Sequence, residues 1–104
     1  DAVTAVSGGG PAYVFLLIET LAKAGVAAGL PEDLSMRIAR ATVAGSGELA
    51  MRSAEPASVL RRNVTSPNGT TQAALEVLMA GDGMQPLFDR AIAAATARSR
   101  QLAG

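Results

Sequence analysis

Apolar residues recur at helical spacing along most of the chain, and no stretch alternates apolar and polar residues for long enough to form a strand. We therefore expect an all-α chain without repeats or low-complexity linkers, forming a single domain over residues 1–104. Residues 1–6 are expected to form a short apolar lead-in and residues 7–11 a flexible turn. About five helices are predicted, over residues 11–28, 31–53, 55–62, 72–80 and 85–102.

Proline and glycine mark the predicted helix ends. Pro11 and Pro31 suit the first position of a helix, and Gly29 suits the end of the first one. Gly45 and Gly47 lie inside the second helix, where each costs up to about 1 kcal/mol relative to alanine. Either they permit close contact with another helix, or the helix kinks or breaks at Gly45 to Gly47.

Two helices carry unusual apolar surfaces. The first is apolar on nearly every face as far as Ile18, so it must be buried centrally or against another subunit. Because a chain of this size buries only part of its surface, we expect an intertwined helical homodimer. The last helix has a stripe that is typical of a core, made by Met84, Leu87, Phe88, Ala91, Ile92, Ala95 and Leu102.

A polar turn at residues 63–71 separates the helical runs. Pro67 cannot lie inside a helix, and Asn68 with Gly69 favours a turn. We expect Thr70 or Thr71 to cap the next helix. Free amides at a helix start, beside a glycine and two hydroxyls, can bind an anion, and a carboxylate suits this uncharged turn better than a polyphosphate. The alternative is a loop followed by a well-capped helix, without a ligand.

Composition excludes several classes of function. The chain of 104 residues is 49% hydrophobic and contains neither cysteine nor histidine, which removes thiol and imidazole catalysis, disulfides and typical zinc sites. Nine basic and nine acidic residues cancel, so no nucleic-acid partner is expected. The longest apolar run, residues 11–18, is too short for a membrane span. Without cysteine or a visible leader, we expect a cytoplasmic protein.

A dinucleotide site is not expected within this sequence. Gly8 and Gly10 match the first half of a dinucleotide-binding fingerprint, but Tyr13 stands where its third glycine belongs, and no strand precedes it.

Three segments, residues 6–13, 25–31 and 63–71, together resemble the C-terminal dimerisation domain of the delta-1-pyrroline-5-carboxylate reductases. The last contains the pattern Ser-Pro-x-Gly-x-Thr. The resemblance implies an enzyme that reduces pyrroline-5-carboxylate to proline with NADPH or NADH. It also implies a helical domain that dimerises by interlocking helices, with dimers that assemble into higher oligomers in many members. This domain normally follows a Rossmann domain, which this sequence does not include. Residues that choose between the two cofactors would lie in that domain.

The resemblance also implies residue roles. Backbone amides and a threonine hydroxyl of the turn would hold the substrate carboxylate. Asn63 would lie beside the cofactor, and Thr4 would lie near the reacting ring as a candidate catalytic residue that hydrogen-bonds the imine nitrogen. No metal ligand is implied. The substrate-binding residues would be Ser66, Asn68, Gly69, Thr70 and Thr71.

The chain departs from the family pattern at Gly9, usually serine, and at Asn68, usually glycine. Asparagine tolerates left-handed backbone geometry, so Asn68 should preserve the turn. Two other functions remain open. One is a non-catalytic helical oligomerisation module. The other is the helical half of another nicotinamide-dependent dehydrogenase, in which a helical lysine is commonly catalytic; here the only lysine is Lys23.

Overall fold

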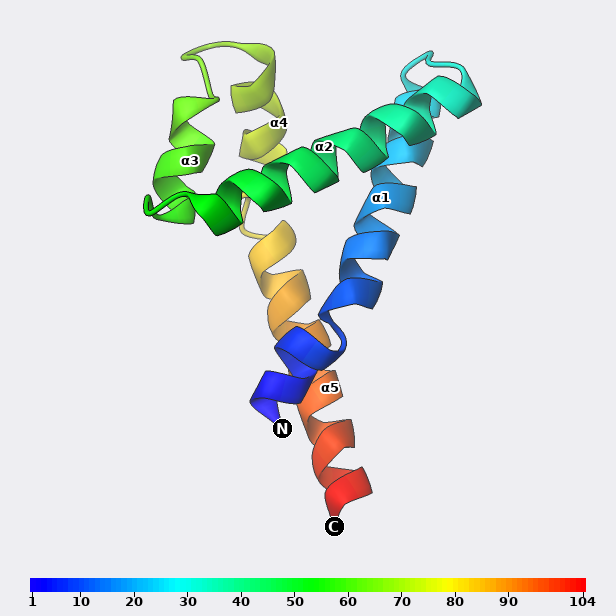
Figure 1. Cartoon of the computed structure of the whole chain (residues 1–104), viewed down its shortest axis with the longest axis vertical. Helices are drawn as coiled ribbons and strands as arrows, with labels where there is room; N and C mark the ends of the chain where they lie inside the picture. Colours follow the sequence, from blue (N-terminus) through cyan, green and yellow to red (C-terminus); the bar gives the residue numbers. More distant parts are fainter. The chain divides into compact units, whose positions relative to one another are not determined.

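The structure, a computed structural model, describes residues 1–104 and consists of helices and turns (Figure 1). This confirms the predicted all-α class. A short π-helix, η1, precedes the α-helices. The elements are η1 Thr4–Gly8, α1 Gly10–Ala27, α2 Glu32–Arg52, α3 Ala57–Asn63, α4 Thr70–Leu78 and α5 Met84–Ala103. The five predicted helices are therefore all present, with ends that differ by one or two residues from the prediction.

The chain divides into two compact units. One contains residues 9–54, and the other combines residues 1–8 with residues 55–104. The expectation of a single domain over residues 1–104 therefore stays a prediction.

In the unit of residues 9–54, α1 and α2 form a hairpin. The turn between them contains Gly29, whose φ of 114° confirms its predicted role as a helix stop. The two helices approach closely where Gly25 faces Ser35. Ser35 is buried, and its Oγ donates a hydrogen bond of 2.7 Å to the carbonyl of Ala22. A missing side chain on α1 thus makes room for a buried hydroxyl on α2.

We expect Gly25→Ala to lower the free energy of unfolding by about 1–3 kcal/mol, the usual cost of overpacking. The added Cβ would fall on the Ser35 Oγ, which cannot move away without losing its hydrogen bond. Ser35→Ala removes that atom. The free energy of unfolding of the double variant should therefore be close to that of Ser35→Ala alone. Urea unfolding at fixed protein concentration measures both. Strictly additive losses would show that the two residues do not share this contact.

The helix α2 is continuous through its glycines. It runs as one helix over Glu32–Arg52, so the alternative of a break at Gly45 to Gly47 is wrong. A Cβ built at either glycine would meet no atom within 4 Å. The close helix contact expected at these positions is therefore not made within the chain.

In the other unit, η1 packs against α5, beside the N-terminus in Figure 1. Ala5 is 2% exposed, which makes it the most deeply buried residue of the chain. The lead-in over residues 1–6 is helical from Ala2 onward, and the prediction of a flexible turn over residues 7–11 was wrong, because η1 extends to Gly8 and α1 begins at Gly10. The sequence predicted α5 but not that residues 4–8 pack against it.

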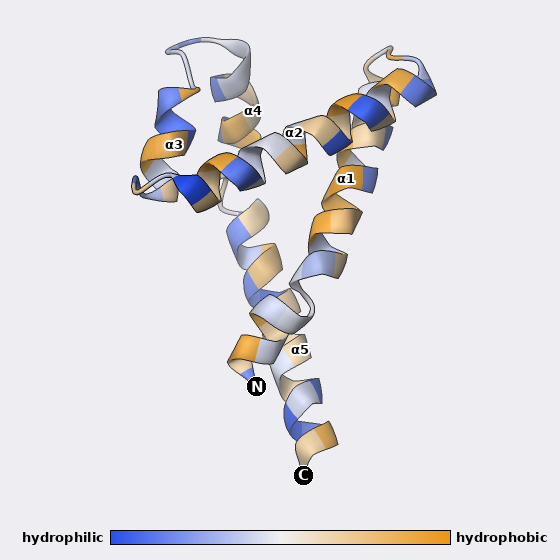
Figure 2. Ribbon diagram, in the orientation of Figure 1, coloured by the Kyte–Doolittle hydropathy of each residue, from blue (hydrophilic) through white to orange (hydrophobic).

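Large apolar side chains remain exposed in both units. Phe15 and Leu16 of α1 are 63% and 60% exposed, and Figure 2 shows hydrophobic colour over successive turns of this helix. The expected core stripe of α5 was wrong for the isolated chain, because Leu87, Phe88 and their neighbours are exposed and α5 has no buried residue. The sequence predicted that α1 is buried either centrally or against another subunit. Central burial is not observed within this chain.

The helix α1 is long and apolar enough to cross a membrane by length and composition alone. The apolar run at residues 11–18 is only the first part of this helix, which continues to Ala27. A core helix of a soluble protein passes the same test, so this one helix is weak evidence for a span.

Candidate functional site

The turn between α3 and α4 is built by hydrogen bonds within its own sequence. Thr65 Oγ1 donates to the carbonyl of Arg61 at 2.6 Å, which anchors the chain to the end of α3. The amide of Gly69 donates to the carbonyl of Ser66 at 3.1 Å, which closes the turn. Between them Asn68 has a φ of 60° and is the one non-glycine residue in the left-handed region. This confirms that Asn68 preserves a glycine-type turn.

The N-terminus of α4 differs from the prediction in one respect. Gly69 is the N-cap residue and Thr70 is already helical, so the prediction that Thr70 or Thr71 caps the helix was wrong. The extended backbone of Gly69 turns the chain into the helix without a capping side chain. The first helical bond runs from the amide of Ala73 to the carbonyl of Gly69, at 3.2 Å.

This arrangement leaves polar groups free at the start of α4. The amides of Thr70, Thr71 and Gln72 have no acceptor in the chain, as expected for the first turn of a helix. The hydroxyls of both threonines are likewise without a hydrogen-bond partner, and both residues are exposed. Free donors and the positive end of the helix dipole therefore face solvent together, which is the arrangement that binds anions.

Sequence reasoning missed Gln72. Its side-chain Oε1 accepts a hydrogen bond from the amide of Asn68 at 2.5 Å, tying the left-handed residue to the first turn of α4. A glutamine three residues after an N-cap is a known signal for a side chain that reaches back. The sequence prediction placed the cap at Thr70 or Thr71, and Gln72 does not lie three residues after either of them. It does lie three residues after the observed cap, Gly69.

The structure brings most of the predicted site residues together. Ser66, Asn68, Gly69, Thr70 and Thr71 all lie in this turn or at the start of α4, and Asn63 is the last residue of α3. Thr4 is not with them. It begins η1, which packs against α5 and which Figure 1 shows well away from the α3–α4 turn of the same unit.

Charge near the turn is positive. No charged side chain lies between residues 63 and 75, whereas Arg61 and Arg62 occupy the last turn of α3, as predicted. Both arginines are exposed and neither forms an ion pair. They add a favourable field for an anion near the turn without occupying its donors.

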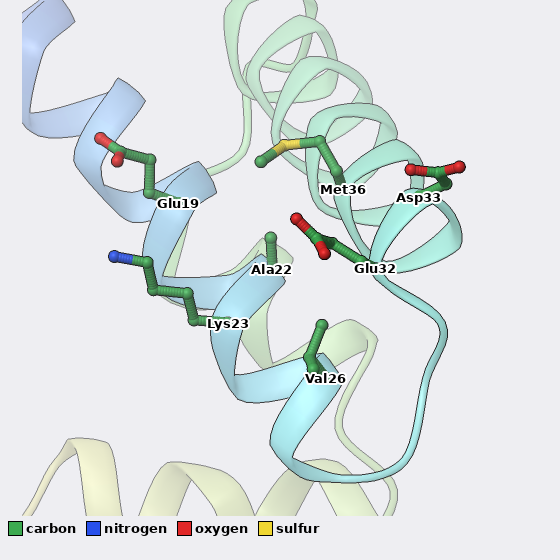
Figure 3. A pocket seen from close by; sticks show the side chains of 7 residues that line it. All are labelled: Glu19, Ala22, Lys23, Val26, Glu32, Asp33 and Met36. Carbon is green, nitrogen blue, oxygen red and sulfur yellow. The ribbon is translucent and has the colours of Figure 1, made fainter.

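A separate pocket of about 430 Å³ lies between α1 and α2. Figure 3 shows Glu19 and Lys23 on one side of it, with Glu32 pointing toward the space between the helices. None of the predicted site residues lines it, and no group of three or more histidine, cysteine or acidic side chains in the chain could hold a metal ion. The pocket therefore does not belong to the turn.

Comparison with known proteins places this fold in a family. Residues 1–102 match the sequence model described as pyrroline-5-carboxylate reductase dimerisation. The chain is 46% identical over 103 residues to a pyrroline-5-carboxylate reductase of Pseudomonas aeruginosa, covering 99% of this chain and 37% of that protein. It is 47% identical over 102 residues to the enzyme of the same name from Pisum sativum, covering 98% of this chain and 37% of that protein. The chain thus spans well under half the length of these relatives.

Solved structures agree. The pyrroline carboxylate reductase of Plasmodium falciparum, with NADP bound, superposes with a TM-score of 0.91 at 38% identity, over 100% of this chain and 39% of that one. The pyrroline-5-carboxylate reductase of Coxiella burnetii gives the same score and identity, over 97% and 37%. The family model, the sequence relatives and the solved structures agree: this chain belongs to the pyrroline-5-carboxylate reductase family, as its dimerisation domain.

Proposed function

We propose that this chain is the dimerising and substrate-binding part of a cytoplasmic enzyme that reduces 1-pyrroline-5-carboxylate to L-proline with NADPH or NADH. Its relatives carry the name of that activity. The observation that supports a substrate site in this part of the enzyme is the set of free donors at the start of α4.

In this proposal the substrate carboxylate binds at the start of α4. The amides of Thr70 and Thr71 donate to its oxygens, and the hydroxyl of Thr71 adds a charge-assisted hydrogen bond. Gly69 lets the ligand approach the backbone because no side chain covers these amides. Ser66 and Asn68 hold the shape of the turn through the Gly69–Ser66 and Asn68–Gln72 hydrogen bonds.

In this proposal the chain contacts the nicotinamide cofactor only at one edge. Asn63 is exposed at the end of α3 and its side-chain amide is without a partner, so it can contact a cofactor that is held elsewhere. The reduced nicotinamide supplies the hydride when it is bound. This chain contributes orientation, because a carboxylate fixed at α4 limits how the imine ring can lie. Because η1 and the α3–α4 turn of one chain lie apart, Thr4 is proposed to hydrogen-bond the imine nitrogen of a substrate whose carboxylate is held by α4 of the second copy in the proposed homodimer.

The proposed assembly is a homodimer of interlocking helices. Its support is the exposed apolar surface of α1 and α5 together with the open glycines of α2. A second copy would bury these surfaces.

The test is oxidation of NADPH and NADH by the full-length enzyme with pyrroline-5-carboxylate, with Thr71→Ala compared to Thr71→Ser. Loss of a hydrogen bond to a charged group costs about 1.5–3 kcal/mol, so Thr71→Ala should raise the KM for pyrroline-5-carboxylate at least about tenfold. Thr71→Ser keeps the hydroxyl and should stay within about threefold. The KM for NADPH should not change in either variant.

Two outcomes would contradict the proposal in different ways. A wild-type enzyme inactive with both cofactors would remove the reductase function and favour a non-catalytic oligomerisation module. An active enzyme in which Thr71→Ala behaves as wild type would remove Thr71 from the site.

A further inference from the structure

The first residues of the chain are fastened to the last helix by a polar contact. Ser99 Oγ donates a hydrogen bond of 2.7 Å to Asp1 Oδ1, across 98 residues of sequence. Arg100 Nε lies 3.8 Å from Asp1 Oδ2. Four residues after Asp1, the methyl group of Ala5 is almost fully buried. The segment of residues 1–8 is therefore docked on α5 at two points, one polar and one apolar.

Of the two contacts to Asp1, the hydrogen bond from Ser99 is the shorter, and both lie at the exposed surface. The Arg100 side chain is 72% exposed, and an ion pair so open to water has little strength. Ser99 is half-buried and lies on the same face of α5 as Ile92 and Thr96, which are also half-buried. The Thr96 hydroxyl already donates to the carbonyl of Ile92, at 2.7 Å. On this face of α5, the hydroxyl of Ser99 is therefore the one that binds the Asp1 carboxylate.

The docked segment contains Thr4. This residue begins η1 and lies between the anchored Asp1 and the buried Ala5, while its own side chain is exposed. A single π-helical turn has little stability of its own, so its position depends on what it packs against. Here that support is α5. The contact between Asp1 and Ser99 and the buried Ala5 therefore together hold the segment that contains Thr4.

We propose that Ser99 is a positioning residue of the enzyme, which through Asp1 holds η1 on α5 and so places the Thr4 hydroxyl for the reaction. The inference rests on the proposed function, in which Thr4 contacts the imine nitrogen. Ser99 itself touches neither substrate nor cofactor in this proposal. Its effect should therefore pass entirely through Thr4.

A double-mutant cycle in the full-length enzyme tests this dependence. Ser99→Ala should lower kcat about fivefold to tenfold, and Ser99→Thr, which keeps the hydroxyl, should remain within twofold of wild type. Thr4→Val removes the group that is being positioned and should also lower kcat. In the Thr4→Val background, Ser99→Ala should cost less than twofold more, because residues that act through one contact are not additive.

Hydrogen exchange gives a second readout that does not need activity. The amides of residues 4–8 should exchange at least about tenfold faster in Ser99→Ala than in wild type, while those of α4 do not change. Unchanged exchange would overturn the docking role. An equal loss of kcat from Ser99→Ala in both backgrounds, or no loss from Thr4→Val, would overturn the link to Thr4. A wild-type enzyme without activity would instead defeat the proposed function, with exchange still deciding the docking.

Discussion

Gly69→Val in the full-length enzyme is expected to reduce kcat/KM for pyrroline-5-carboxylate by about 100-fold or more, while the protein remains dimeric. The φ of Gly69 is −89°, which any residue can adopt, so the loss would not come from backbone strain. The loss would come from steric crowding. A Cβ at this position lies 3.2 Å from the carbonyl oxygen of Ser66 and 3.4 Å from its Cβ. The two further methyl groups of valine would push the turn away and cover the free amides.

The matched control is Gly69→Ala, which adds the tight Cβ without the branched methyl groups. Its loss should be much smaller than that of valine, because a shift of a few tenths of an ångström relieves one close contact. A loss of 100-fold corresponds to about 2.7 kcal/mol of transition-state stabilisation. Steady-state kinetics with sedimentation analysis of each variant measures both properties. Gly69→Val with wild-type kinetics would show that the substrate does not bind at the start of α4.

Phe15→Asp is expected to raise the dimer dissociation constant by about 1000-fold or more. Phe15 is 63% exposed in the chain, so within one chain the change would have little effect on stability. In a dimer that covers α1, it would remove about 1.5–3 kcal/mol of apolar burial and place an unpaired carboxylate in the interface. Together these terms exceed the roughly 4 kcal/mol that a 1000-fold change requires.

Arg52→Gln is the matched control, because it changes the net charge by the same amount on an exposed side chain. Its ion pair with Glu48, at 2.9 Å, joins two exposed groups of the same helix and contributes little. Sedimentation velocity over a range of concentrations should show dissociation for Phe15→Asp only. A Phe15→Asp variant that sediments as the wild-type dimer does would place the interface elsewhere than on this part of α1.

Local chemistry in the sequence was sufficient to predict the helices and the turn. Gly29 and Asn68 both adopt positive φ, as their residue types indicate, because few other side chains tolerate that geometry. The helical spacing of apolar residues located all five α-helices. The predicted residues from Ser66 to Thr71 lie in one turn because they are neighbours in sequence.

The predictions that failed depend on what each residue packs against. The cap of α4 was assigned to a threonine because a hydroxyl is the usual cap, whereas Gly69 takes the position and Gln72 supports the turn. The stripe of α5 was assigned to a core because periodicity identifies an apolar face but not the surface that covers it.

The sequence by itself determined the helical class, the helix boundaries to within two residues and the polar turn, since all of these follow from contacts between residues close in the chain. Only the tertiary structure decided that Ser35 fills the space left by Gly25, and that Asp1 meets Ser99. Contacts between distant residues arise when whole helices pack. Their energies depend on shape and hydrogen-bond geometry that no local pattern of residue types encodes.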